Sequence, residues 1–187
     1  TDSESAAFLK GLSTGVQGLP PPFALENIYP AVEQFVSDRR QKADAEFKQK
    51  QLTQNDEFFV ALKKKTNVVF LPDGLAYEIL QAGTGAFPQT NQIAKVNYTG
   101  RLISGRIFDA TDPSLGPLDI DPNTVIVGWR EGIQKINRGG KIRLYIPPTL
   151  GYGDANTSGI PPYSTLVFEV ELLSLSDPQP ATSLENK

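Results

Sequence analysis

Val96-Asn-Tyr-Thr-Gly-Arg-Leu102, followed by Arg106-Ile-Phe-Asp109, is the stretch that decides the fold of this chain of 187 residues. Apolar residues alternate along its first part, which predicts a β-strand with one buried face. Further along the chain, Gly151-Tyr-Gly153 and Ile160-Pro-Pro162 add another aromatic ring and a rigid loop. We expect these segments to meet around a single pocket lined by aromatic side chains and by Asp109.

The chain has no His and no Cys. Ser-His and Cys-His nucleophiles, zinc sites built on thiolate or imidazole, haem and iron-sulfur clusters all need one of these residue types. Only carboxylates, Lys, Tyr, Ser and the backbone are left to act in the predicted pocket. We therefore expect no metal and no cofactor.

Composition and charge limit the classes of protein to which this chain can belong. Hydrophobic residues make up 39% of the chain, which is enough for a packed core in one medium domain with an extension. The net charge of -3 gives no basic field of the kind that binds nucleic acid or anionic lipid. No apolar run approaches the roughly 20 residues that cross a bilayer. We expect neither a nucleic-acid partner nor a membrane span.

Two features bear on the compartment. A chain without Cys fits an exported protein that avoids stray thiols, although it is also compatible with the cytosol. The sequence begins at Thr1 and contains no Met, which suggests that a leader has been removed. We expect a periplasmic or otherwise exported protein, with a cytoplasmic one as the alternative.

Residues 1–67 have helical periodicity. Apolar positions between Ser3 and Val16 recur at spacings of three and four, which predicts a short amphipathic helix. The run Leu19-Pro-Pro-Pro22 is a rigid break. A second apolar stripe follows from Leu25 to Val36, where Pro30 is acceptable in the first turn of a helix.

Beyond this stripe, residues 38–57 are polar nearly all round but rich in strong helix formers. One interpretation is a surface helix packed on the main domain. The other is a solvated arm that separates an N-terminal interaction module from a C-terminal domain, with the apolar stripes of residues 8–36 buried against a partner chain.

From Val68 onward the period changes to two. Apolar residues alternate in runs that predict strands with one buried face: Leu75–Ile79, Ala94–Leu102, Ile142–Ile146 and Leu166–Leu172. A short helical segment, Trp129–Asn137, places Ile133 and Ile136 on its inner side. Several strands and one helix predict an α+β fold, an antiparallel sheet packed over that helix, for residues 68–176. A polar tail, 177–187, follows.

Residues 90–176 resemble an FKBP-type peptidyl-prolyl cis-trans isomerase domain. The resemblance is carried by motifs in family order and at near-family spacing: Val96-Asn-Tyr-Thr-Gly100, Gly105-Arg-Ile-Phe-Asp109, Val125-Ile-Val-Gly-Trp129, Arg130-Glu-Gly132, Gly140-Lys-Ile-Arg143, Ile146-Pro-Pro148, Leu150-Gly-Tyr-Gly153, Gly159-Ile-Pro-Pro162 and Ser164–Leu172. The N-terminal part resembles the helical extension of the macrophage-infectivity-potentiator-like bacterial branch of this family.

The resemblance implies a twisted antiparallel sheet wrapped on one short helix, preceded by a helical extension with a long helix. It also implies isomerisation of X-Pro bonds in unfolded or partly folded polypeptides, together with chaperone activity, homodimerisation through the N-terminal helices, and binding of macrolides of the FK506 or rapamycin type. The alternative is a chaperone or binding module that keeps the fold with weak or no isomerase activity.

The family pattern assigns roles to particular residues. Trp129 is expected to form the floor under a prolyl ring, with a carbonyl held by the Ile126 N-H and another by the Tyr152 hydroxyl. Asp109 is the carboxylate pointed inward. The expected catalytic residues are Asp109, Tyr152, Phe108 and Tyr98, and the expected substrate-binding residues are Leu118, Val125, Ile126, Trp129, Ile160 and Phe168.

Two positions depart from the family pattern. Leu118 stands where members often have a pocket Phe, and Ser114 stands where some have an Arg that pairs with the carboxylate. The partner of Asp109 is therefore open at this point, with Arg106 and Tyr98 as candidates.

Overall fold

The computed structural model describes residues 2–19, 25–157 and 159–177. Contacts divide the chain into two compact units, 1–47 and 48–187, which we describe separately. The boundary between the units falls inside a helix, so the domain limits expected from the sequence (1–67, 68–176 and 177–187) stay predictions. The Pro-rich break at 20–22 and nearly all of the polar tail lie outside the described residues.

The first unit contains helix α1, Asp2–Val16, and the beginning of helix α2, Leu25–Leu62. The short helix predicted for residues 3–16 is therefore confirmed. It ends where Gly18 adopts the left-handed conformation, with φ of 66°, and where Leu19 N donates to Thr14 O at 3.3 Å. None of the described helices is long and apolar enough to cross a bilayer.

Helix α2 is one continuous helix through the apolar stripe and the polar segment after it. The sequence pattern favours the first turn of the helix for Pro30. The helix begins at Leu25, however, so Pro30 lies in its second turn. Val32, Phe35 and Val36 are exposed on this helix. The last turns, by contrast, pack on the sheet: Leu62 is buried there. The helix thus has an exposed part, as an arm would, and a docked end.

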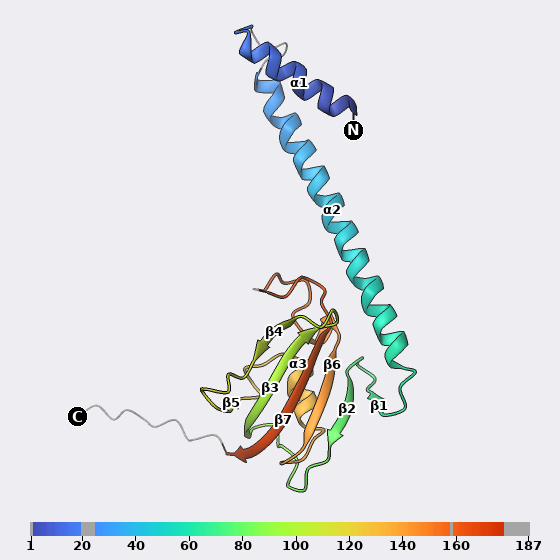
Figure 1. The fold of residues 1–187 in the computed structure, drawn as a ribbon, viewed down its shortest axis with the longest axis vertical. Coiled ribbons are helices and arrows are strands. Elements are labelled where there is room, and N and C mark those ends of the chain that lie inside the picture. The colour runs from blue at the N-terminus through green and yellow to red at the C-terminus, as the bar shows by residue number, and fades with distance from the viewer. Residues whose placement is uncertain (1, 20–24, 158, 178–187) are drawn as a thin grey trace, which may run out of the picture. The chain divides into compact units, whose positions relative to one another are not determined.

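The second unit is built on one antiparallel sheet with the strand order β1-β2-β6-β7-β3-β4 and with β5 paired to β3 (Figure 1). The strands are β1 (Val68–Phe70), β2 (Ala76–Gln81), β3 (Ile93–Leu102), β4 (Ile107–Ala110), β5 (Leu118–Ile120), β6 (Lys141–Ile146) and β7 (Leu166–Ser176), and the short helices are α3 (Val127–Ile133) and η1 (Pro148–Leu150). The α+β fold expected from the sequence is confirmed.

Helix α3 packs against β6 on the inner face of the sheet, where the main core lies. Two glycines of α3 allow a close approach. A Cβ at Gly128 would lie 2.5 Å from Ile146 Cγ2, and a Cβ at Gly132 would lie 2.5 Å from Leu144 Cδ1. Ile133 and Ile136, the predicted inner residues, are both buried in this core.

The outer face of the sheet carries a second, smaller cluster. Leu62 from the end of α2 packs there with Ala76 and Tyr145. Beside this cluster Arg143 Nη1 donates to Glu78 Oε2 at 3.1 Å, and the Tyr145 hydroxyl donates to the same oxygen at 2.9 Å. Glu78 is thus buried with its charge compensated, as burial of a carboxylate requires.

The sequence prediction for β2 was wrong at Ile79. Alternation placed Ile79 with Leu75 and Tyr77 on a buried face, but Ile79 is 41% exposed, while Ala76 and Glu78 are buried instead. The reason is that α2 and β1 cover the outer face at this edge of the sheet, and a register shift between Ile79 and Gln81 ends the regular pairing with β6.

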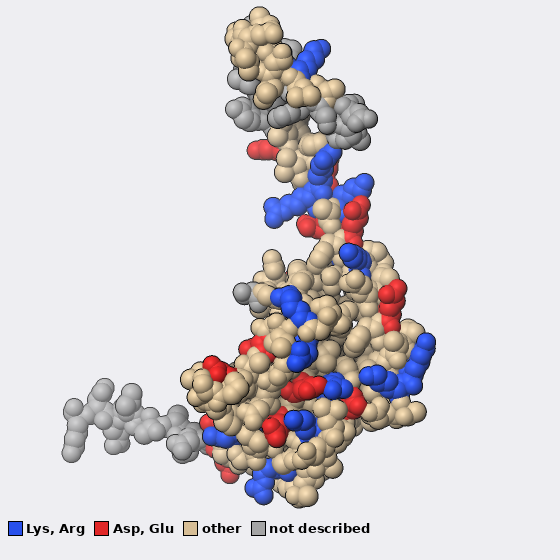
Figure 2. Space-filling model, viewed as in Figure 1, with Lys and Arg blue, Asp and Glu red and all other residues tan. Residues whose placement is uncertain are grey.

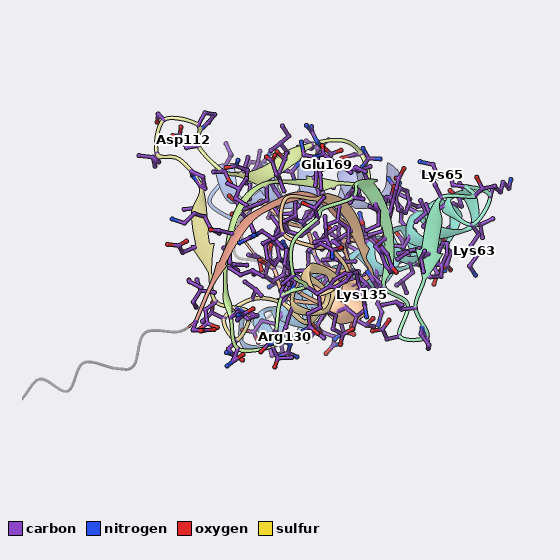
Figure 3. The ribbon with its side chains drawn as sticks, turned by 90° about the horizontal axis from the view of Figure 1, so that it is seen from below. Lys63, Lys65, Asp112, Arg130, Lys135 and Glu169 are labelled. Atoms are coloured by element: carbon purple, nitrogen blue, oxygen red, sulfur yellow. The ribbon has the colours of Figure 1, made fainter. Side chains whose placement is uncertain are left out.

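Charged side chains of both signs are interspersed over the face of the second unit shown in Figure 2, in keeping with the small net charge. Seen from below, Glu169 of β7 lies on one side of the sheet, and Arg130 of α3 and Lys135, which follows α3, lie on the other (Figure 3). The face shown in Figure 2 therefore has no large patch of one sign.

The contact of α3 with β6 gives a first prediction. Gly132→Ala should lower the free energy of unfolding by about 1 to 3 kcal/mol, because the new methyl group overlaps Leu144. Gly11→Ala is the matched control, since nothing lies within 4 Å of the position of its Cβ. Urea titration followed by the fluorescence of Trp129 measures both. Equal midpoints for the two variants would contradict the tight helix-sheet contact.

Candidate active site

A cavity of about 200 Å³ opens on the inner side of the sheet between β3, β4 and α3. Its walls combine aromatic rings with a few polar groups. The lining residues are Tyr98, Phe108, Asp109, Ile120, Thr124, Val125, Ile126, Trp129, Tyr152 and Phe168. The pocket predicted from the sequence is therefore formed by segments that lie far apart along the chain.

The aromatic rings of the cavity pack edge to face. Phe108 and Phe168 have centroids 5.4 Å apart and planes at 87°, and Trp129 meets Tyr98 at 6.1 Å and 83°. This arrangement is favoured by the ring quadrupoles and keeps each ring in one orientation. Trp129 and Phe168 are buried, so they can act as a rigid floor and wall.

Gly100 is the reason that two of these rings can approach the strand. It lies on β3, and a Cβ there would be 2.7 Å from the ring of Phe108 and 2.8 Å from that of Phe168. Any larger residue would push both rings into the cavity. The glycine in the stretch Val96–Leu102 thus follows from packing around the site.

Asp109 has its hydrogen-bond partner in Tyr98. The Tyr98 hydroxyl donates to Asp109 Oδ2 at 2.6 Å, from β3 across to β4. Arg106, the other candidate, points elsewhere, since its Nη2 donates to Gly159 O at 2.5 Å. Ser114 donates through its hydroxyl to Asp112 Oδ1 at 2.7 Å and takes no part in the pocket. The sequence left this choice open, and the structure decides it.

Burial raises the pKa of Tyr98 above the ordinary value of a phenol, and the hydrogen bond to Asp109 raises it further. The phenol therefore stays protonated and remains a donor throughout the neutral and mildly alkaline range. Asp109 itself is exposed to solvent at the rim of the cavity. Water and one phenol hydroxyl can satisfy an exposed carboxylate, so no cation is needed beside it.

Ile126 and Tyr152 present polar groups to the cavity from opposite elements. Ile126 precedes α3, and its carbonyl accepts from Trp129 N and from Arg130 N, each at 3.1 Å. Its own N-H donates to no atom of the described residues. Tyr152 follows η1 and is 39% exposed, so its hydroxyl is open to a ligand.

Two of the predicted site residues lie away from the lining. Leu118 is 40% exposed on β5, and Ile160 is 5% exposed in the main core. Sequence reasoning missed Ile120 and Thr124, which do line the cavity. Ile120 lies two residues after Leu118 on the same strand, so alternation within β5 was the signal that could have identified it.

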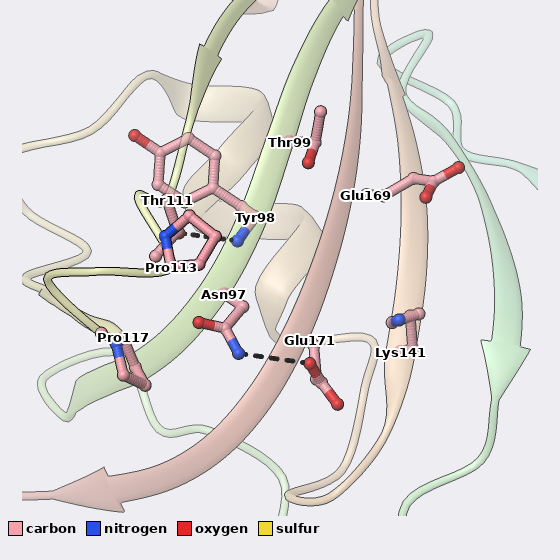
Figure 4. Close-up of a pocket in the computed structure, with 10 residues that line it drawn as sticks. Asn97, Tyr98, Thr99, Thr111, Pro113, Pro117, Lys141, Glu169 and Glu171 are labelled. Atoms are coloured by element: carbon pink, nitrogen blue, oxygen red, sulfur yellow. Dashed lines mark hydrogen bonds between the residues drawn. The ribbon is translucent and has the colours of Figure 1, made fainter.

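A second, larger hollow of about 410 Å³ lies on the outer face of the sheet (Figure 4). Its carboxylates are engaged within the protein: Glu171 accepts from Asn97 Nδ2 at 3.3 Å, and Glu169 accepts from Arg143 Nε at 3.0 Å. It has no cluster of aromatic rings among its lining residues. The smaller, inner cavity is therefore the better candidate site.

The described residues include no group of three or more Asp and Glu side chains placed to hold a metal ion. The inner cavity offers one carboxylate, two phenol hydroxyls, a free backbone N-H and apolar walls. Such a set can desolvate a ligand and donate hydrogen bonds to its carbonyl groups. It has no pair of groups suited to proton transfer.

Comparison with protein families gives two matches. A family described as FKBP-type peptidyl-prolyl cis-trans isomerase matches residues 84–173, and one described as the domain amino terminal to FKBP-type peptidyl-prolyl isomerase matches residues 1–79. Between them these matches account for both the helical and the sheet-forming parts of the chain.

Comparison with individual proteins supports the same family. Outer membrane protein MIP of Legionella longbeachae is 35% identical over 170 residues, which are 89% of this chain and 73% of that protein. FKBP-type peptidyl-prolyl cis-trans isomerase FkpA of Escherichia coli K12 is 44% identical over 131 residues, 70% of this chain, and the match spans 47% of that protein. The crystal structure of FkpA from Escherichia coli has a TM-score of 0.81 at 34% identity, covering 94% of this chain and 83% of that one.

The bond between Tyr98 and Asp109 gives a second prediction. The folded pKa of Tyr98 lies above its unfolded value of about 10. Its contribution to stability is therefore fully present below pH 10 and is lost as the pH rises further. Tyr98→Phe should cost about 1 to 2 kcal/mol at pH 8. Above pH 10, the unfolding free energy of the wild type should fall more steeply than that of the variant. Parallel curves from urea titrations at pH 8 to 11 would contradict this.

Proposed function

The chain belongs to the FKBP-type peptidyl-prolyl cis-trans isomerase family, and from this we propose that its inner cavity accelerates rotation about X-Pro bonds in unfolded or partly folded polypeptides. The observation that carries the proposal is the composition of the cavity wall. Aromatic rings form the floor, and two donors at the rim, the Ile126 N-H and the Tyr152 hydroxyl, have no acceptor among the residues that the structure describes.

The chemistry of prolyl isomerisation suits such a site. Rotation is slow because resonance in the amide sets a barrier of about 18 to 20 kcal/mol. No bond is broken and no proton has to move. The planar amide is more polar than the twisted one, so a cavity that removes water and fits the twisted geometry lowers the barrier. Each tenfold acceleration needs roughly 1.4 kcal/mol of such selective stabilisation.

The residues divide this task. Trp129 provides the floor for a prolyl ring, and the faces of Phe108 and Phe168 close the sides. The Ile126 N-H and the Tyr152 hydroxyl hold substrate carbonyls on either side of the bond that turns. Asp109 fixes Tyr98 through their hydrogen bond and places negative charge beside the amide. Macrolides of the FK506 or rapamycin type would compete for the same cavity.

The isomerase proposal is tested with a short proline peptide and with proline-limited refolding of a test protein. Tyr152→Phe should lower kcat/KM about tenfold, the effect of losing one hydrogen bond in the transition state. Asp109→Ala should lower it by a similar or larger factor, because the Tyr98 ring loses its anchor. Asp119→Asn is the matched control, since Asp119 is an exposed carboxylate that pairs with Lys95 on the surface.

Unchanged rates in both variants would exclude the inner cavity as the catalytic site. If the wild type suppresses aggregation but leaves the refolding rate unaltered, the alternative holds, and the chain acts as a chaperone or binding module with this fold.

We propose that the first unit forms a homodimer and adds chaperone activity. Its large apolar side chains are exposed in both helices: Leu9, Leu12, Val16, Val32, Phe35 and Val36. Leu9, Leu12 and Val16 lie on one face of α1, and Val32, Phe35 and Val36 on one face of α2, and exposed apolar faces of this kind usually mark an interaction site. A dimer would present two catalytic cavities to one polypeptide and raise the effective concentration of binding sites. The name of the Legionella longbeachae relative, outer membrane protein MIP, supports the proposal that this chain is exported.

The dimer gives a further prediction. Light scattering should report about twice the chain mass of 20.4 kDa at micromolar concentration. The double change Val32→Asp with Val36→Asp should give the monomer mass, because both side chains are exposed on one face of α2. Ala45→Asp with Gln49→Asp adds the same charge to the polar part of the helix and should leave the dimer intact. A monomeric wild type would refute the proposal.

A further inference from the structure

The loop that carries Tyr152 is closed at its base by backbone hydrogen bonds. Tyr163 N donates to Gly153 O at 2.7 Å, and Gly153 N donates to Pro148 O at 2.9 Å. Tyr152 lies between the two acceptors of this network, next to Gly153. The position of the Tyr152 hydroxyl at the cavity therefore depends on the position of Tyr163, at the other end of the loop.

Tyr163 has an unusual backbone conformation. Its φ is 61°, and among the described residues no other non-glycine residue has a positive φ. A side chain with a Cβ is strained in this region, so such a residue persists only where its surroundings hold it. Strain of this kind is concentrated at functional sites.

Helix α2 supplies the group that holds it. Asn55 Nδ2 donates to Tyr163 O at 2.8 Å, and the Lys48 ammonium lies 5.1 Å from the centre of the Tyr163 ring. The carbonyl, the N-H and the ring of Tyr163 are thus each engaged, the first and last of them by the helix. The docked end of α2 and the loop behind the cavity form one contact.

Burial of the Asn55 amide costs free energy that a purely structural contact would not require. It is 5% exposed, and its Oδ1 has no hydrogen-bond partner among the described residues. A buried amide that is only half satisfied stabilises a helix contact less well than an apolar side chain would. What an apolar side chain cannot do is donate to the Tyr163 carbonyl.

We propose that Asn55 is a positioning residue for the isomerase reaction: through Tyr163 and Gly153 it fixes the loop that places the Tyr152 hydroxyl over the cavity. The inference rests on the proposed function, since it concerns the same site. It assigns to the long helix a role in catalysis that is separate from any role in dimerisation.

Asn55→Leu tests the proposal, because it keeps the branched shape and the number of heavy atoms of the buried side chain and removes the donor. We expect kcat/KM for a proline peptide to fall about tenfold, while the urea midpoint stays at or above that of the wild type. Asn55→Ala provides a second variant without a donor. Asp56→Asn, an exposed neighbour on the same helix, is the control and should match the wild type in both measurements.

A double-mutant cycle separates positioning from general destabilisation. If Asn55 acts through Tyr152, Asn55→Leu should have little further effect in a chain that already carries Tyr152→Phe. The same factor in both backgrounds would overturn the proposal, as would full activity of Asn55→Leu.

Amide hydrogen exchange gives a readout that does not depend on catalysis. Protection of the Tyr163 N-H should fall in Asn55→Leu and stay unchanged in Asp56→Asn. A wild type without isomerase activity would refute the proposed function, and the exchange data would still decide whether Asn55 holds the loop. Unchanged protection in Asn55→Leu would overturn the inference.

Discussion

The close contact between α3 and β6 is the constraint on which the rest of the second unit depends. Gly128 and Gly132 bring the helix within van der Waals distance of Ile146 and Leu144. Because α3 lies so near the sheet, Trp129 points across the inner face and meets the rings of Tyr98 and Phe168. The cavity is the space left on one side of this contact, where β3 carries Gly100 in place of a larger residue. The fold and the site therefore depend on the same feature, glycines at positions where a Cβ would clash with a neighbouring side chain.

The strands and α3 can be predicted from the local sequence pattern, but the second, smaller cluster on the outer face cannot. A period of two in Ala94–Leu102 and Leu166–Leu172 predicts which face is buried, and the structure agrees for these central strands. Alternation fails at Ile79 because it describes one strand at a time and contains no information on what covers the other face. The end of α2 covers it. The apolar residues of that last turn, Phe58, Phe59 and Leu62, were visible in the sequence, but their partner on the sheet was not.

The candidate site was predictable to the extent that it is made of motif residues. Tyr98, Phe108, Asp109, Trp129 and Phe168 lie in short motifs with fixed spacing, and the structure gathers them around one cavity. Ile120 and Thr124 lie outside these motifs: alternation with Leu118 in β5 could have identified Ile120, but only the path of the chain reveals Thr124. The partner of Asp109 is a further case. Arg106 and Tyr98 are both within reach along the sequence, and the choice depends on the pairing of Gly100 with Asp109 between β3 and β4, which turns Tyr98 toward the carboxylate.

The rate of a reaction without proton transfer depends strongly on where the side chains of the site lie. When an enzyme has a general base, part of the rate comes from the proton transfer that this group performs. In the proposed mechanism the acceleration comes from shape, desolvation and hydrogen bonds that are stronger to the twisted amide. Each of these depends steeply on distance. The donors at the rim therefore need support from behind, and the Tyr152 hydroxyl belongs to a loop with no helix or strand of its own beyond the single turn of η1. The contact of Asn55 with Tyr163 supplies such support from a rigid helix, at the one described non-glycine residue whose backbone requires it.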